Sequence, residues 1–220
     1  MSAARRARLR GLYAITPLTH DTADLAARAQ ACVAGGARVL QYRFKDLPQG
    51  LALEQATALA DVCRRGGALF IVNDSLSVAR AAGADGVHLG RDDGDVRAAR
   101  KAWPEGVIGA SCYADIELAR AAAEAGADYI GIGSVFASPT KPGAVRAPLE
   151  TLARARAASG LPVAAIGGIT LGNAPLAIEA GADMLAVISA VFDSPDVRAA
   201  AQAFNRLFEA NPSGALHVRP

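Results

Sequence analysis

Short runs of apolar residues alternate with longer alanine-rich segments along the chain from Gly11 onward. The runs are rich in Val, Ile and Leu, as is typical of strands buried on both faces, and the segments between them have the pattern of amphipathic crossover helices. The predicted strands are Leu12–Thr16, Val39–Arg43, Leu69–Asn73, Gly86–Leu89, Val107–Cys112, Tyr129–Val135, Val163–Gly167 and Met184–Ser189. Eight such units favour a closed (β/α)₈ barrel.

Two of the predicted helices span Ala114–Ala125 and Asp196–Ala210. The second repeats apolar residues on one face: Val197, Ala201, Phe204 and Phe208. We expect Ser194 to cap it, with Pro195 at the first helical position.

A short motif, Ala-Gly-Ala-Asp, recurs before three of the strands. It occupies Ala82–Asp85, Ala125–Asp128 and Ala180–Asp183. In each copy the glycine suits the position after a helix end, where a left-handed conformation turns the chain into the next strand.

Length and composition predict a single domain. The chain has 220 residues, 52% hydrophobic and 20% charged, enough to bury one large core. We assign residues 1–10 to a basic N-terminal tail, 11–210 to the barrel and 211–220 to a flexible C-terminal tail. A doubly wound sheet is the alternative, but no G-x-G-x-x-G follows the first strand, as a dinucleotide-binding sheet would require.

The charge pattern argues against a nucleic-acid or membrane partner. The net charge is only +2, and the arginines near the N-terminus lack interleaved aromatic residues. No apolar run has the length of a signal peptide core or a membrane span. Cys32, Cys63 and Cys112 have no metal-ligand spacing and fit small core residues in a reducing compartment. We therefore expect a cytoplasmic protein, and the sequence leaves a homo-oligomer open.

Candidate chemistry collects at the predicted carboxyl ends of the strands, where barrel enzymes place their active sites. Gln41, Arg43 and Lys45 alternate, so they project to one side of an extended segment and suit a polyphosphate. The alternative is that these cations are solvated or ion-paired.

Acidic residues follow the third and fourth strands. Asp74 and Asp93 are candidate Mg²⁺ ligands, because carboxylate and phosphate oxygens are what this ion prefers. The alternative is that Asp92, Asp93 and Asp95 cap the following helix. We interpret His88, inside the fourth strand, as a packed and hydrogen-bonded core residue rather than a catalytic one.

A second anion site is predicted at the last two strands. Gly168 and Ser189 match the phosphate site of many barrels, where backbone N–H groups hold the anion. The loop Ser134–Lys141 adds hydroxyls and an ammonium group, although by itself it also fits an ordinary surface loop.

Taken together, these strand ends resemble the thiamine phosphate synthase family from Gly11 to about Phe192. The matching pieces are GLYAIT, QYRFK, Asn73-Asp74, ADGVHLG, IGAS, GADYIGIGSVF, AIGGI and GADMLAVISAVF. The resemblance implies phosphorylated small-molecule substrates and one Mg²⁺ per subunit, held by Asp74 and Asp93. It implies that the pyrimidine diphosphate binds at Gln41, Tyr42, Arg43, Phe44, Lys45, Asn73, Ser111 and Lys141. The thiazole phosphate would bind at Ser138, Pro139, Thr140, Gly168, Ile188 and Ser189.

The family's reaction joins 4-amino-2-methyl-5-(diphosphooxymethyl)pyrimidine to a thiazole phosphate, or to its carboxylated precursor, and releases pyrophosphate. The resemblance gives catalytic roles to Arg43, Lys45, Lys141 and Ser111. The resemblance also implies a loose, carbocation-like transition state, which needs charge stabilisation and positioning rather than a strong base.

The chain departs from the family pattern at three positions. Tyr113 replaces a usual histidine, Arg91 a common glutamine and Ser138 a common threonine. A thiazole tautomerase on the same barrel is one alternative function, but its acid/base histidine would lie at Tyr113. A non-catalytic phosphate binder is the other, since a fold alone fixes no chemistry.

Overall fold

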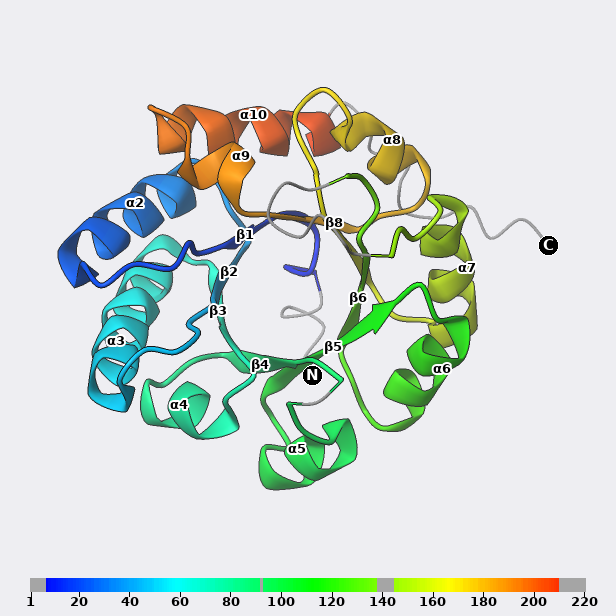
Figure 1. The fold of residues 1–220 in the computed structure, drawn as a ribbon, viewed down its shortest axis with the longest axis horizontal. Helices are drawn as coiled ribbons and strands as arrows, with labels where there is room; N and C mark the ends of the chain where they lie inside the picture. The colour runs from blue at the N-terminus through cyan, green and yellow to red at the C-terminus, as the bar shows by residue number, and fades with distance from the viewer. Residues whose placement is uncertain (1–6, 92, 138–144, 210–220) are drawn as a thin grey trace.

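Eight parallel strands close into a barrel surrounded by helices in the computed structural model, which describes residues 7–91, 93–137 and 145–209 (Figure 1). The strands are β1 (Gly11–Ile15), β2 (Val39–Tyr42), β3 (Leu69–Asn73), β4 (Gly86–Leu89), β5 (Val107–Tyr113), β6 (Tyr129–Gly133), β7 (Val163–Ile166) and β8 (Met184–Val187). β1 pairs with both β2 and β8, so the sheet has no free edge. The predicted (β/α)₈ barrel is confirmed.

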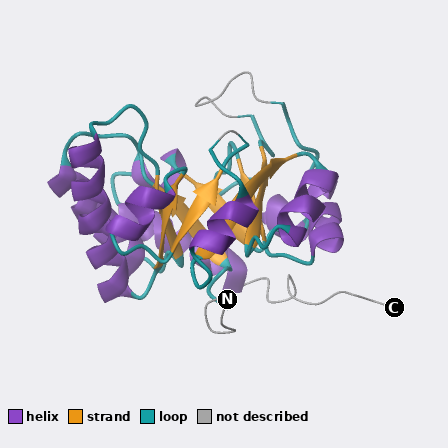
Figure 2. Ribbon diagram, turned by 90° about the horizontal axis from the view of Figure 1, so that it is seen from below, coloured by secondary structure: helices purple, strands orange, loops and turns teal. Residues whose placement is uncertain are grey.

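The helices form an outer ring around the strands, as the side view shows (Figure 2). They are α2 (Thr22–Ala34), α3 (Gln49–Gly66), α4 (Leu76–Ala81), α5 (Val96–Ala102), α6 (Ile116–Glu124), α7 (Glu150–Ser159), α8 (Ala174–Glu179), α9 (Ser189–Phe192) and α10 (Val197–Glu209). Among the described residues, no helix combines the length and apolarity needed to cross a bilayer.

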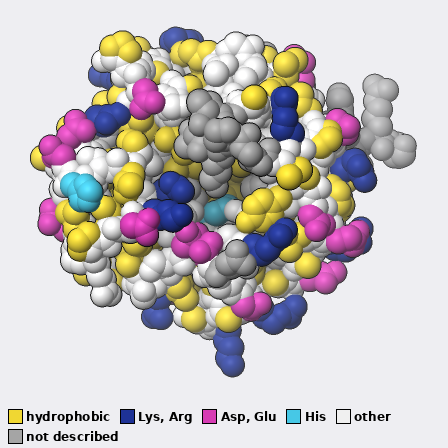
Figure 3. Space-filling model, viewed as in Figure 1, with side chains coloured by type: hydrophobic (Ala, Val, Ile, Leu, Met, Phe, Trp, Pro, Cys, Tyr) yellow, Lys and Arg dark blue, Asp and Glu magenta, His cyan; other side chains and the backbone are white. Residues whose placement is uncertain are grey.

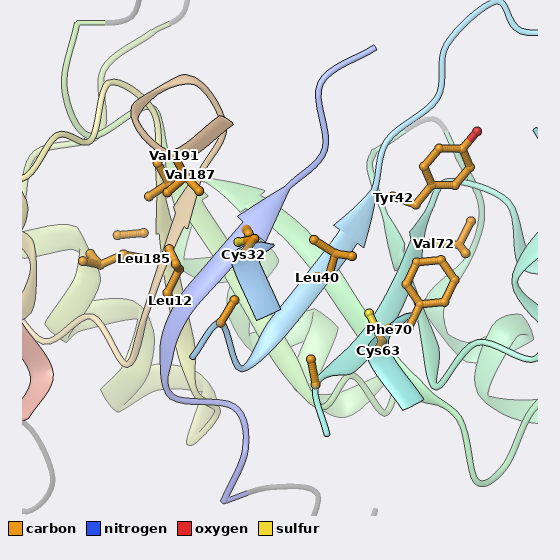
Figure 4. Close-up of a cluster of buried hydrophobic side chains, with 14 of the residues drawn as sticks. Leu12, Cys32, Leu40, Tyr42, Cys63, Phe70, Val72, Leu185, Val187 and Val191 are labelled. Atoms are coloured by element: carbon orange, nitrogen blue, oxygen red, sulfur yellow. The ribbon is translucent and has the colours of Figure 1, made fainter. Parts of the chain in front are cut away.

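Two apolar layers lie on opposite faces of the strands. The outer layer packs strand residues such as Leu12, Leu40 and Phe70 against helices, and Cys32 and Cys63 belong to it (Figure 4). The inner layer fills the barrel. It contains Leu9, Tyr13, Ile15, Val39, Leu69, Ile71, Val107, Tyr129, Ala164, Met184 and Ala186. All three cysteines are buried and unpaired with one another, as the sequence predicted.

The repeated Ala-Gly-Ala-Asp motif connects a helix end to two strands. Gly83, Gly126 and Gly181 all have positive φ, as predicted for the residue after a helix. The aspartate that follows accepts a backbone N–H from the preceding strand. These bonds join Asp85 to Phe70, Asp128 to Ile108 and Asp183 to Val163, at 2.8 to 2.9 Å. Each motif therefore both ends a helix and fastens the start of its strand to a neighbour.

The structure corrects two sequence assignments. Asp196, not Ser194, caps α10, since its Oδ1 accepts the N–H of Ala199 at 2.9 Å. Ser194 instead bonds to the backbone of Asp196. The basic tail also ends earlier than predicted, because Leu9 is 2% exposed and belongs to the inner layer of the barrel. Residues 1–6 of the predicted N-terminal tail and the whole predicted C-terminal tail, 211–220, lie outside the described residues.

The motif's energetic role can be tested at Asp128, which also accepts a hydrogen bond from Arg100 at 2.6 Å and is largely buried. We expect Asp128→Ala to lower the free energy of unfolding by about 2–4 kcal/mol, because the N–H of Ile108 loses its acceptor and Arg100 loses its ion-pair partner. Denaturant unfolding measures the change. Glu117→Ala is the control, since its ion pair with Arg120 is exposed and should contribute less than about 1 kcal/mol. Equal losses in the two variants would contradict this assignment.

Candidate active site

Most of the predicted site residues lie at the carboxyl end of the barrel. Figure 3 looks onto this end and shows Lys or Arg side chains next to Asp or Glu side chains around a hollow. The strand ends place Gln41, Asn73, Ser111, Gly168 and Ser189 here, on β2, β3, β5 and the segments that follow β7 and β8. We call this region the mouth. Ser138, Pro139, Thr140 and Lys141 lie outside the described residues.

The end of β2 separates residues that sequence reasoning had grouped. Gln41 is 4% exposed and points into the barrel, where its Nε2 donates to the Tyr13 hydroxyl at 3.0 Å. Tyr42 points outward, because neighbouring residues of a strand face opposite sides. Its hydroxyl donates to Gln55 of α3 at 2.8 Å, and its ring stacks on Phe44 with centroids 5.1 Å apart.

The side chains of Tyr42 and Phe44 therefore pack in the outer apolar layer, as Figure 4 shows for Tyr42. Their assignment to the pyrimidine diphosphate site stays a prediction. Arg43 is partly buried, Lys45 is exposed, and the N–H of Arg43 donates to Thr16 Oγ1 at 3.1 Å.

A chain of hydrogen-bonded side chains crosses the barrel below the mouth. It continues from Gln41 and Tyr13 to Tyr129, with 2.7 Å between the two tyrosine hydroxyl oxygens. The Tyr129 hydroxyl lies 3.0 Å from His88 Nδ1, and His88 Nε2 lies 2.9 Å from Ser111 Oγ. Burial lowers the pKa of His88 to about 4. His88 is thus hydrogen-bonded and packed, as interpreted from the sequence, and it also contacts a candidate site residue.

Two glycines make room for this chain. A Cβ atom on Gly109 would lie 2.1 Å from Tyr129 Cζ and 2.5 Å from His88 Nδ1. A Cβ atom on Gly131 would lie 3.4 Å from His88 Cε1. A larger residue at position 109 would separate Tyr129 from His88.

Asp74 and Asp93 come together at the mouth. Their carboxyl groups are close enough to share a hydrogen bond, and both flank Gly90. Burial, followed by the nearby charge of Asp93, raises the pKa of Asp74 to about 6, while Arg43 acts in the opposite direction. Two neighbouring carboxyl groups offer only oxygen atoms as ligands, and such a set fits a divalent cation such as Mg²⁺.

The N-cap of α5 is Asp95 rather than Asp93. The Oδ1 atom of Asp95 accepts the N–H of Ala98 at 2.7 Å. Within the described residues no group of three His, Cys, Asp or Glu side chains forms a metal centre. A cation at Asp74 and Asp93 would therefore take further ligands from water and phosphate oxygens, as Mg²⁺ commonly does.

The ends of β7 and β8 carry the second candidate anion site. Gly167 and Gly168 both have positive φ, and a Cβ atom on Gly168 would lie 2.1 Å from the Ala137 carbonyl oxygen. Asn173 Nδ2 donates to the Gly168 carbonyl oxygen at 2.9 Å and holds this turn. Ser189 is exposed at the start of α9, next to the partly buried Ile188.

Two of the three departures from the family pattern, Arg91 and Tyr113, contact each other. The guanidinium carbon of Arg91 lies 4.9 Å from the centre of the Tyr113 ring, a cation–π arrangement. Tyr113 has φ of +55° and is 43% exposed at the end of β5. Asp46 and Asp74 also have positive φ. Such conformations are costly for residues other than glycine and concentrate at functional sites.

Comparison with known proteins shows which family this arrangement belongs to. The thiamine monophosphate synthase family matches residues 12–191. The chain belongs to this family. Thiamine-phosphate synthases from Thiobacillus denitrificans and Chromobacterium violaceum are 55% and 56% identical to it. Both alignments cover 92% of this chain, and 96% and 98% of those proteins.

A solved family structure has the same fold. Thiamine phosphate pyrophosphorylase from Pyrococcus furiosus superposes with a TM-score of 0.84 at 37% identity. The alignment covers 93% of this chain and 98% of that one. The family resemblance predicted from the strand-end motifs is confirmed.

Sequence reasoning missed Tyr13 and Tyr129 as neighbours of the site. Both occupy inward positions of strands whose other inward residues are aliphatic or small. Glycines on the adjacent strand, such as Gly109, were the available signal, because a buried aromatic hydroxyl needs both space and a partner.

The importance of this space can be tested with Gly109→Ala. We expect a loss of about 1–3 kcal/mol in the free energy of unfolding, because the added methyl group overlaps the Tyr129 ring. Turnover should also fall, since the link from Tyr129 through His88 to Ser111 would be broken.

Gly50→Ala is the matched control, because nothing lies within 4 Å of a Cβ atom there. It lies in α3 and should leave turnover unchanged and stability equal or up to about 1 kcal/mol higher. Unfolding curves and initial rates of both variants measure these effects. A fully active and stable Gly109→Ala protein would show that the close packing is not needed.

Proposed function

We propose that this chain catalyses the reaction of its family, in which an aminopyrimidine diphosphate and a thiazole phosphate form thiamine phosphate and pyrophosphate. Membership of the family makes it a transferase of thiamine biosynthesis. The observation that carries the proposal for this site is the Asp74–Asp93 carboxyl pair beside Arg43. It offers a place for a cation and an anion together at the mouth.

Mg²⁺ at Asp74 and Asp93 would neutralise charge on the diphosphate and on the pyrophosphate that leaves. Arg43 lies close enough to influence Asp74 and would bind the same anion from the protein side. Lys45 and Lys141 are proposed to add positive charge, and Ser111 to donate a hydrogen bond. Gln41 and Asn73 would hold the pyrimidine end of the substrate.

The thiazole phosphate is proposed to bind across the mouth at Gly168, Ile188 and Ser189. Gly168 has a left-handed conformation and carries no side chain, and backbone N–H groups of this turn are proposed to hold the anion. Ser138, Pro139 and Thr140 would complete this site.

The chemical step needs charge stabilisation and alignment, since the thiazole nitrogen is itself the nucleophile. As the C–O bond to the diphosphate breaks, negative charge grows on the leaving oxygen, and Arg43, Lys45 and Lys141 would stabilise it. Binding both substrates at one mouth replaces a bimolecular encounter by a positioned one. The interior of the barrel, closed below by apolar residues such as Leu9 and Met184, excludes water from beneath.

A thiazole tautomerase would need a proton shuttle where Tyr113 lies. The Tyr113 ring is covered by the Arg91 guanidinium. An imidazole is the usual shuttle near neutral pH, and a phenol is a poor replacement. The geometry therefore favours the synthase.

The direct experiment incubates the purified protein with both phosphorylated substrates and Mg²⁺ and follows products by mass spectrometry. We expect thiamine phosphate and pyrophosphate in equal amounts. Isomerised thiazole phosphate without thiamine phosphate would establish the tautomerase instead. Binding of both ligands without any product would establish the non-catalytic binder.

Two nearby aspartates give a matched test of the metal proposal. Asp93→Asn should lower turnover roughly 10²-fold or more, because the carboxylate pair loses a charge that the cation needs. Asp95→Asn should keep turnover near wild type, because Asp95 caps α5 and an asparagine is also a good cap.

Initial rates over a range of Mg²⁺ concentrations measure the difference between the two variants. A wild-type rate and unchanged Mg²⁺ dependence in Asp93→Asn would overturn the assignment of Asp93 as a ligand.

A further inference from the structure

The hydrogen-bonded chain through the barrel joins two residues assigned to the same substrate. Gln41 on β2 is one end and Ser111 on β5 is the other. Between them lie Tyr13, Tyr129 and His88, which come from β1, β6 and β4. The polar atoms of these three side chains hydrogen-bond one another and the two end residues.

The donor at one end determines which atom donates and which accepts in every hydrogen bond of this side-chain chain; we call this its direction. The Gln41 amide donates to Tyr13, so the Tyr13 oxygen accepts there and its own hydrogen is left for Tyr129. The Tyr129 hydroxyl then donates to the next atom along, His88 Nδ1. A neutral imidazole has one N–H and one bare nitrogen.

Because His88 accepts at Nδ1, its hydrogen must be on Nε2, which faces Ser111. Ser111 Oγ therefore accepts from His88. The Ser111 hydrogen is then free to point away from His88 and toward the mouth.

If every hydrogen bond beyond Tyr13 ran the opposite way, the buried Tyr13 hydroxyl would have no acceptor for its hydrogen among the described residues. Tyr129 would then donate to Tyr13, whose oxygen would accept two hydrogen bonds. Unpaired buried donors are costly, so this arrangement is disfavoured. In that case His88 Nε2 would accept from Ser111, and the serine could not donate to an anion.

We propose that His88 is a positioning residue that, through the Tyr13–Tyr129 pair, fixes the Ser111 hydroxyl as a donor to the diphosphate in the mouth. The identity of the anion rests on the proposed function, whereas the direction of the chain does not. Gly109 and Gly131 support this role, because they leave the space in which the Tyr129 and His88 side chains meet.

The direction can be measured without any substrate. The protein has three histidines, so its ¹⁵N imidazole spectra are simple. The set of signals that is lost in His88→Gln belongs to His88. We expect the His88 ring in the wild type to carry its hydrogen on Nε2. A hydrogen on Nδ1 would reverse the chain and overturn the proposal, whether or not the protein makes thiamine phosphate.

The link to catalysis is tested by a double-mutant cycle. Tyr129→Phe keeps the ring but removes the hydroxyl, and should lower kcat about tenfold because the Ser111 hydroxyl loses its fixed orientation. In a Ser111→Ala background the same change should have no further effect on kcat. Independent, multiplicative losses would show that Tyr129 acts on the fold and not through Ser111.

A second test compares His88→Gln with His88→Leu, since the glutamine amide can still donate toward Ser111 but cannot connect to Tyr129 in the same way. We expect His88→Gln to retain more activity than His88→Leu, which has no donor. If unfolding curves show that both variants are folded, equal kcat values for the two would also overturn the proposal.

Discussion

Closure of the sheet is the constraint on which the site depends. Eight strands share one narrow interior, so every inward side chain must fit those of strands that lie across the barrel. The lower part is filled by aliphatic residues such as Val39, Ile71 and Met184. Nearer the mouth several inward residues are polar, and Gln41, Tyr13, Tyr129, His88 and Ser111 form hydrogen bonds with one another. Ser111 and Gln41 are therefore held by the packed interior of the barrel rather than by loops, which gives a binding site its geometry before the ligand arrives.

Electrostatics at the mouth combines both signs of charge within a small space. The Asp74–Asp93 pair disfavours full ionisation of both groups, as the raised pKa of Asp74 indicates, and Arg43 provides the opposing positive charge. A divalent cation would relieve the repulsion between the carboxylates, and a diphosphate would complete the coordination of the cation and pair with the arginine. This arrangement suits a reaction whose main requirement is a stable leaving anion. Such a reaction needs no nucleophilic side chain, because the thiazole nitrogen is the nucleophile.

The sequence predicted those features that depend on local pattern. The strands and their order follow from short apolar runs, and the helix ends at Gly83 and Gly126 follow from the demands of a left-handed turn. The family followed from motifs at several strand ends. Features that depend on contacts between distant segments were missed. Tyr13 and Tyr129 are 116 residues apart, and only the register of a closed barrel brings their hydroxyls together. Tyr42 was grouped with its neighbours because the sequence motif is continuous, whereas the strand alternates and turns that side chain toward α3.

The most direct test of this account is the binding of pyrophosphate, the proposed leaving group, measured by titration calorimetry with and without Mg²⁺. The measurement needs no turnover, so it reports on the mouth itself. We predict binding that requires Mg²⁺ in the wild type and is weakened at least tenfold in Asp74→Asn and in Asp93→Asn, because the cation would lose a carboxylate ligand. Asp95→Asn should bind as the wild type does, since that side chain caps α5. Pyrophosphate binding that is independent of Mg²⁺ and unchanged in all three variants would contradict the account.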